Sequence, residues 1–181
     1  MKLKFLLLVL ALQTAWILAT AFVQERALTQ GQLILLETRP ADPRDLLRGD
    51  YVILNYKISD VPMDAFSPPV TVELPAGRTI YVLLEKRGEF YEVASAATEK
   101  LSPAGGQVML RGTSQYWWNS AQQKSVRVEY GLERYYVREG TGNPRGKLTV
   151  QVSAPASGHG AIKQVFVEGK PYAEAMKEAA K

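Results

Sequence analysis

The N-terminal part of the chain is its longest apolar run. Hydrophobic side chains dominate residues 5–23, with Gln13 and Thr14 as polar interruptions near the middle. A helix of about nineteen residues, rising about 1.5 Å per residue, nearly spans a hydrocarbon core about 30 Å thick. Lys2 and Lys4 precede the run, and the positive-inside rule then predicts a cytoplasmic N-terminus with the rest of the chain outside. The pattern therefore predicts a single-pass membrane anchor.

Two other interpretations compete with the anchor. A cleaved signal peptide also begins with basic residues, and residues 19–21 (Ala-Thr-Ala) match an A-x-A cleavage site. A core helix of a soluble protein would show a polar face, which this run lacks. We favour the anchor because the apolar run is long and continues through Phe22 and Val23. Residues 1–24 are thus expected to lie in the cytoplasmic (inner) membrane, and residues 25–181 to form an extracytoplasmic, periplasmic domain.

Beyond this run, hydrophobic and polar residues alternate in short stretches separated by glycine and proline. Alternation with a period of two is typical of strands that bury one face. Arg87-Gly88 marks a predicted hairpin, and another is expected before a short C-terminal helix. Seven or eight such strands predict an all-β domain, mainly an antiparallel sandwich or barrel-like. The strands are predicted in residues 31–40, 51–59, 79–97, 106–115, 125–131, 147–154 and 160–170, and the helix in residues 171–180.

The stretch DPRDLLRGDYVILNY, residues 42–56, predicts one capped helical turn followed by a strand. Asp42 is placed to cap the turn, and Gly49 is placed to end it in a left-handed conformation. Residues 60–78 contain four prolines and are expected to be mostly loop, whereas residues 132–146 are ambiguous at first and turn-rich at the end. One face of the strand is expected to lie in the core. This face consists of Val52, Leu54, Tyr56 and Ile58.

Composition excludes several kinds of chemistry. The 181-residue chain has no cysteine, which excludes disulfides, thiolate metal sites and cysteine nucleophiles. His159 is the only histidine, and the sequence shows no evident partners for it in a serine protease triad. Metal sites built on several histidines are excluded, because the chain has only one. A Ser–Lys dyad lacks its nucleophile, because no serine lies between Gly31 and Ile58. The net charge of +4 gives no reason to expect nucleic-acid binding, and no cofactor or metal is predicted.

Carboxylates and aromatic residues remain as candidate site residues. A glycosidase would need two carboxylates facing each other across a cleft. Trp117 and Trp118 are adjacent, so a regular strand would leave one ring free for a membrane interface, a glycan or a protein. Arg134 can pair with Asp50 or Glu133, and arginine and tyrosine are common in interfaces. The candidate carboxylates are Asp42, Asp45, Asp50, Glu129, Glu133 and Glu139.

The stretch GDYVILNY, residues 49–56, carries a recognisable pattern. It matches GDYXXLXY in register, and EYGLERYYVREGTG, residues 129–142, is similar to a later segment of the same family. The chain therefore resembles the GDYXXLXY family over most of the region after the apolar run. The resemblance implies a bacterial membrane-anchored protein that accompanies multi-pass membrane proteins of the DUF2157 or DUF4401 kinds. It implies a location and a class of partner rather than a reaction.

We predict a non-catalytic accessory subunit of a bacterial membrane complex, whose helix and membrane-near surface bind a multi-pass membrane partner. The alternative is an envelope hydrolase or glycan-binding domain that uses surface carboxylates and the aromatic pair Trp117-Trp118. Local structure accounts for Gly49, Leu54 and Tyr56, so Asp50 and Tyr51 are the first candidates for a contact. The predicted binding residues are Gly49, Asp50, Tyr51, Leu54, Tyr56, Glu133, Arg134 and Tyr135.

Overall fold

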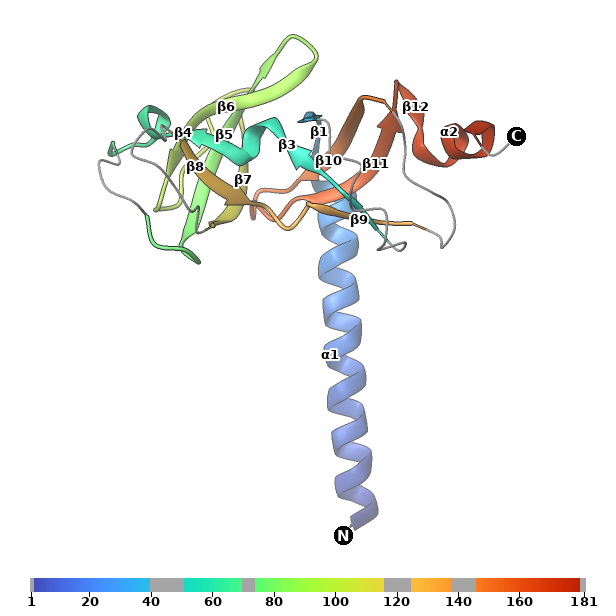
Figure 1. The fold of residues 1–181 in the computed structure, drawn as a ribbon. Coiled ribbons are helices and arrows are strands. Elements are labelled where there is room, and N and C mark those ends of the chain that lie inside the picture. The colour runs from blue at the N-terminus through green and yellow to red at the C-terminus, as the bar shows by residue number, and fades with distance from the viewer. Residues whose placement is uncertain (1, 40–50, 70–73, 116–124, 138–145, 180–181) are drawn as a thin grey trace.

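The computed structural model of the chain describes residues 2–39, 51–69, 74–115, 125–137 and 146–179. A long helix, α1 (Lys2–Gln30), projects from one side of a β-rich domain (Figure 1). Its segment Lys4–Phe22 is long and apolar enough to cross a membrane, as an anchor or a signal sequence would be, and none of it is buried. The helix continues past residue 24 and contacts the β domain only near its C-terminal end (Figure 1).

The first sheet has five antiparallel strands in the order β12-β11-β10-β1-β3. Strand β1 directly follows α1 and pairs with the C-terminal strand β10, with Leu36 opposite Val150. Ile34 and Leu36 are buried at alternate positions of β1, as the period of two predicts. The strands are β1 (Gln32–Arg39), β3 (Asn55–Tyr56), β10 (Leu148–Ala154), β11 (Ala161–Val167) and β12 (Lys170–Pro171).

The second sheet also has five strands, in the order β4-β8-β7-β5-β6. Strand β5 pairs with the edge strand β6 on one side and with the central strand β7 on the other, and both pairings are antiparallel. Gly112 on β7 lies so close to β8 that a Cβ atom there would come within 2.4 Å of Val128 Cγ1. The strands are β4 (Asp60–Pro62), β5 (Thr79–Arg87), β6 (Phe90–Ala97), β7 (Val108–Ser114) and β8 (Ser125–Glu129).

A separate two-stranded ribbon joins β2 (Tyr51–Ile53) to β9 (Arg134–Tyr136). The described strands do not close into a barrel, so the predicted antiparallel β class is confirmed in its open form. A single core cluster contains buried residues of both five-stranded sheets, including Leu36, Leu84 and Val150. The short helix α2 (Tyr172–Ala179) follows β12, where the terminal helix was predicted.

The predicted single strand over residues 51–59 is wrong in one respect. It is divided into β2, β3 and a 3-10 turn (Lys57–Ser59), because β2 pairs with β9 whereas β3 pairs with β1. The chain changes partner at Leu54, whose N–H donates to the Glu133 carbonyl at 2.8 Å. The alternation survives this change, so the predicted core face is confirmed. Val52, Leu54, Tyr56 and Ile58 are all buried.

Other sequence predictions had mixed outcomes. The hairpin at Arg87-Gly88 and the hairpin of β10 and β11 are confirmed. Residues 60–78 are not only loop, because they contain β4 and a 3-10 turn (Met63–Ala65). No strand was predicted in residues 132–146, but β9 lies there and pairs with β2. The predicted helical turn in residues 41–50 lies outside the described residues.

Candidate binding site on the paired motif segments

The two sequence stretches that carry the family pattern lie side by side. Strands β2 and β9 pair in antiparallel register, with Tyr51 opposite Tyr136 and Ile53 opposite Arg134. The Leu54–Glu133 backbone bond extends the pairing by one more residue on each segment. Residues distant in sequence thus form one unit, and the site is built on it.

Two buried tyrosines lock these segments together reciprocally. The Tyr56 hydroxyl donates to the Leu132 carbonyl at 2.8 Å, and the Tyr130 hydroxyl donates to the Ile58 carbonyl at 2.8 Å. Each segment therefore supplies a tyrosine that satisfies a backbone carbonyl of the other, as buried polar groups require. Burial raises the pKa of both phenols far above the ordinary value, and the negative charge of Glu133 raises the two pKa values further. Both hydroxyls consequently remain hydrogen-bond donors at physiological pH.

Glu133 has a local structural role in this unit. Its Oε1 accepts the backbone N–H of Tyr130 at 2.7 Å, which holds the turn between β8 and β9. The possible ion pair between Glu133 and Arg134 does not form among the described residues, because the Glu133 carboxylate bonds the backbone and the Arg134 guanidinium lies over the ring of Tyr51. The alternative pair of Arg134 with Asp50 lies outside the described residues.

The solvent side of the ribbon carries an aromatic and cationic cluster, which we call the Tyr51 cluster: Tyr51, Arg134 and Tyr136. The rings of Tyr51 and Tyr136 have centroids 6.0 Å apart, at 60° to each other. The Arg134 guanidinium carbon lies 5.4 Å from the centroid of the Tyr51 ring, within range of a cation–π interaction. Tyr136 is 70% exposed, and Arg134 is exposed as well. The cluster thus presents a preformed surface to solvent.

Tyr135 lies on the other side of the ribbon. Its ring meets Tyr172 of α2 edge-on, with centroids 5.5 Å apart, and it packs against the core. Successive residues of a strand face opposite sides, so Tyr135 belongs to the packing between β9 and α2. Leu54 and Tyr56, being buried, likewise support the surface from beneath. Of the predicted binding residues, Tyr51 and Arg134 are brought together on the exposed side.

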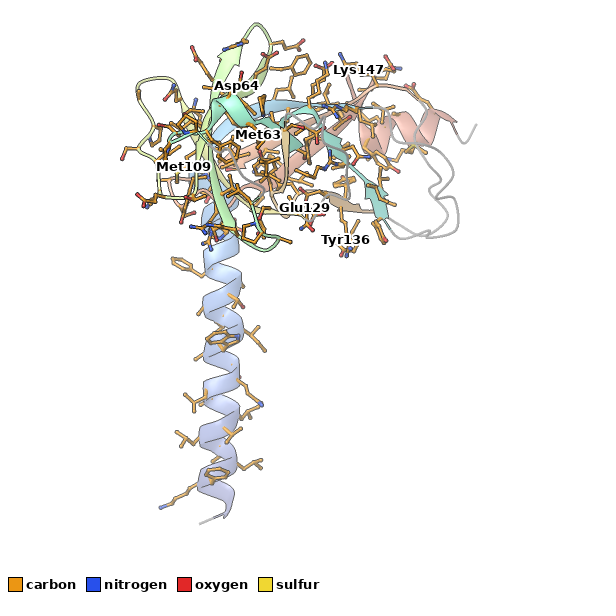
Figure 2. The ribbon with its side chains drawn as sticks, turned by 60° about the vertical axis from the view of Figure 1, so that its left-hand side comes forward. Met63, Asp64, Met109, Glu129, Tyr136 and Lys147 are labelled. Atoms are coloured by element: carbon orange, nitrogen blue, oxygen red, sulfur yellow. The ribbon has the colours of Figure 1, made fainter. Side chains whose placement is uncertain are left out.

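The Tyr51 cluster lies at a distinct place on the domain. Figure 2 shows Tyr136 and Glu129 at the rim from which α1 projects, whereas Asp64 and Lys147 lie at the opposite rim. Figure 1, seen from another side, also places β9 on the side of the domain from which α1 projects. Glu129 is exposed there, and its Oε2 accepts a hydrogen bond from Gln115 Nε2 at 2.8 Å.

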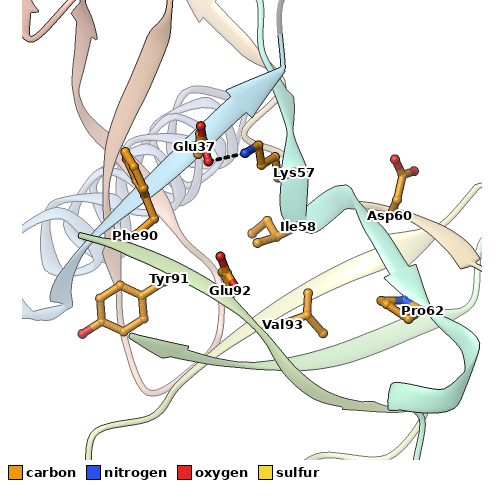
Figure 3. Close-up of a pocket in the computed structure, with 9 residues that line it drawn as sticks. All are labelled: Glu37, Lys57, Ile58, Asp60, Pro62, Phe90, Tyr91, Glu92 and Val93. Carbon is orange, nitrogen blue, oxygen red and sulfur yellow. Dashed lines mark ion pairs between the residues drawn. The ribbon is translucent and has the colours of Figure 1, made fainter. Parts of the chain in front are cut away.

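A shallow groove of about 230 Å³ lies elsewhere, between β1, β6 and the segment around β4. Figure 3 shows Glu37 and Lys57 pointing toward each other beside the apolar side chains of Ile58 and Val93. Glu37 is bonded to two cations, Lys57 at 2.5 Å and Lys147 at 2.7 Å. These two hydrogen bonds hold the pKa of Glu37 below its ordinary value.

The other carboxylates that line this groove are also paired. Asp60 contacts Arg39 and accepts a bond from Arg127 at 3.0 Å, and Glu92 lies 3.7 Å from Arg87. A glycosidase-type mechanism needs one protonated and one free carboxyl group facing a common space. The carboxylates described around this groove instead neutralise neighbouring cations, so the groove gives no support to hydrolysis.

Several predicted site residues have no part in the described site. Gly49, Asp50, Trp117 and Trp118 lie outside the described residues, as do Asp42, Asp45 and Glu139. His159 is exposed, with Nε2 at 3.3 Å from Arg111 Nη1. Within the described part of the chain, no three histidine, aspartate or glutamate side chains gather to hold a metal ion.

Sequence reasoning missed Tyr130 and Tyr136 as members of the site. Both belong to the stretch EYGLERYY, so the resemblance pointed to their segment without giving their roles. The pair Asp60–Arg127 was also missed. These residues lie opposite each other on β4 and β8, and the prediction of a loop at residues 60–78 hid this pairing.

Comparison with known proteins adds one finding. Residues 13–165 match the family model described as "GDYXXLXY protein", which covers most of the chain. Neither the search of curated proteins nor the search of solved structures gave a match. The matched range includes both segments of the paired unit and most of the two sheets.

Proposed function

The chain belongs to the GDYXXLXY family, and from this premise we propose that it is a non-catalytic accessory subunit of a bacterial cytoplasmic-membrane complex. Helix α1 anchors it, the β domain lies outside, and a multi-pass membrane protein is its partner. The observation that carries the proposal is the surface of α1, since none of Lys4–Phe22 is buried by the rest of the chain. Such a surface is free to contact lipid and neighbouring membrane helices.

The middle of α1 supports a protein partner within the membrane. Gln13 is exposed, and its side-chain amide makes no hydrogen bond to the described residues. Thr14, its neighbour, donates its hydroxyl to the Leu10 carbonyl at 2.9 Å and is satisfied within the helix. An amide left without a partner in hydrocarbon is costly, and glutamine side chains are known to bond between membrane helices. Gln13 is thus the position in α1 that gains most from a neighbouring helix.

Orientation follows from the charges that flank the apolar segment. Lys2 and Lys4 precede it, which favours a cytoplasmic N-terminus. The β domain follows α1 and would then lie on the outer side. The ion-paired groove carboxylates agree with a non-catalytic role, since Glu37 and Asp60 each neutralise two cations.

The test is a mild-detergent pull-down of the tagged full-length chain, with mass spectrometry of the bound proteins. Three forms are compared: the wild type, Gln13→Leu and Thr14→Val. We expect a multi-pass protein with the wild type and with Thr14→Val, and much less of it with Gln13→Leu. Both substitutions keep the segment apolar, so the amount of membrane-bound chain should be equal in all three. Absence of a multi-pass protein from the wild-type sample would refute the accessory role.

A second measurement decides between an anchor and a signal sequence. The intact mass of the chain purified from membranes should include residues 1–24. A mature chain that begins directly after Ala21 would show cleavage at the A-x-A site, and α1 could then not hold a partner.

A further inference from the structure

The Tyr51 cluster is not explained by the packing of the β domain. None of its three side chains belongs to the buried core cluster or to the partly buried residues packed against that cluster. No carboxylate of the described residues forms a salt bridge with Arg134, whose guanidinium instead lies over the ring of Tyr51. An exposed cation over one tyrosine ring, with a second tyrosine ring against the first, is a surface available to bind another molecule.

The position of the cluster relative to α1 indicates what it contacts. The apolar segment ends at Phe22 and the helix ends at Gln30, so eight residues, or about 12 Å of helix, separate the hydrocarbon edge from the domain. The headgroup region of one leaflet is about 5–8 Å thick. The rim that carries Tyr136 faces the same way as the apolar segment (Figure 2). Because this rim extends past the C-terminal end of α1 toward the apolar segment (Figure 2), its lowest side chains close the remaining distance between the domain and the headgroups.

The chemistry of the cluster suits that layer. Tyrosine has an apolar ring and a polar hydroxyl, and it is enriched at membrane–water interfaces. Arginine extends its charged end to phosphate and keeps its stem along apolar groups. The cation–π contact holds Arg134 beside the two rings, so the three side chains can enter the interface together.

We propose that the Tyr51 cluster is a lipid-contact surface: Tyr51 and Tyr136 lie among the phospholipid headgroups, and Arg134 binds their phosphates. The domain then has two attachments to the membrane, the helix and the cluster, which fix its tilt. This inference rests on the anchoring role of α1 given above, but it requires no protein partner. Glu129 shares the rim, and its carboxylate accepts a hydrogen bond from Gln115 Nε2.

The absence of cysteine in the chain permits a clean test. A single cysteine is introduced at Glu129→Cys on the cluster rim or at Asp64→Cys on the opposite rim, and each is labelled with a polarity-sensitive fluorophore. The full-length chain is placed in lipid nanodiscs of phosphatidylcholine and phosphatidylglycerol that contain a headgroup spin label. We expect strong quenching at position 129 and little at position 64. Equal quenching at both positions would overturn the proposal.

The cluster itself is tested in the Glu129→Cys background. The double substitution Tyr136→Ser/Arg134→Gln should abolish most of the quenching, whereas the matched surface substitution Arg87→Gln should leave it unchanged. Both Tyr136 and Arg134 are exposed, so circular dichroism should show an unaltered fold. Unchanged quenching in the double variant would show that the surface does not bind lipid, and a lost protein partner in that variant would then assign it to protein docking. Since the nanodiscs contain no other protein, failure here is distinct from failure of the pull-down.

Discussion

Removal of one buried hydroxyl tests the reciprocal tyrosine pairing most directly. In Tyr56→Phe the ring stays in place, fully buried, but the Leu132 carbonyl loses the donor that lies 2.8 Å away. The variant therefore isolates one hydrogen bond between the two motif segments. Tyr136→Phe is the matched control, because its ring is 70% exposed and its hydroxyl can bond to water.

The expected loss can be estimated from burial. A buried carbonyl left without its partner costs about 1–3 kcal/mol of unfolding free energy, and a surface change costs within about 0.5 kcal/mol. A domain of this size has about 5–15 kcal/mol of unfolding free energy in total, so the loss is a substantial part. With a urea dependence of about 2 kcal/mol per M, the unfolding midpoint should fall by about 0.5–1.5 M.

The assay is urea unfolding of the full-length chain in mild-detergent micelles, followed by the β-sheet signal in circular dichroism. The slope of the transition should be the same for the wild type and both variants, so that midpoints compare directly. A midpoint for Tyr56→Phe as close to the wild type as that of Tyr136→Phe would refute the reasoning. It would mean that the buried hydroxyl does not hold the 130–133 segment.

Three further outcomes are expected. Tyr56 and Tyr130 keep their protons in the folded domain but ionise near pH 10 when unfolded, so their raised pKa values predict full stability below about pH 10 and a progressive loss above it. Urea unfolding midpoints measured across about pH 8–11 check this, and a midpoint that does not change with pH would contradict it. The lowered pKa of Glu37 has the opposite effect: its contribution to the free energy of unfolding is present above about pH 4.3 and is lost as the pH falls through the pKa of the folded state. The urea midpoint of Glu37→Gln should therefore change less than that of the wild type between about pH 5 and pH 3. Equal changes in the two proteins would show that Glu37 has no part in acid unfolding. Gly112→Ala places a methyl group against Val128 and the Glu129 carbonyl, so thermal unfolding should show a loss of about 1–3 kcal/mol of unfolding free energy. Gly105→Ala is the control, because the space around Gly105 is open and the unfolding free energy should hardly change.

Local pattern predicted those features that depend on one segment alone. The buried face of Val52, Leu54, Tyr56 and Ile58 follows from alternation, and it holds although the strand is divided. The apolar helix and the two hairpins likewise follow from neighbouring residues, because turn chemistry and hydropathy act over short distances.

Features that depend on distant partners could not be predicted. The break at Leu54 arises because β9 pairs with one side of it and β1 with the other, and neither partner is evident in residues 51–59. The role of Tyr136 follows from its register against β2, and the role of Tyr130 follows from its hydrogen bond to the distant Ile58 carbonyl. Glu133 seemed free to pair with Arg134 because the sequence does not show that its carboxylate reaches the Tyr130 N–H.

The pairing of β1 with β10 has a consequence for the folding of this protein during its synthesis. Glu37 lies opposite Thr149, so the strand that directly follows α1 finds its main partner only after about 110 more residues have been made. At about 5–20 residues per second, ribosomal synthesis leaves β1 with an open edge for roughly 5–20 s. An unpaired hydrophobic edge is a template for aggregation, and β1 presents one throughout that interval. Folding of this chain therefore requires that β1 stay protected, for example by a chaperone, until the C-terminal third of the chain has been made.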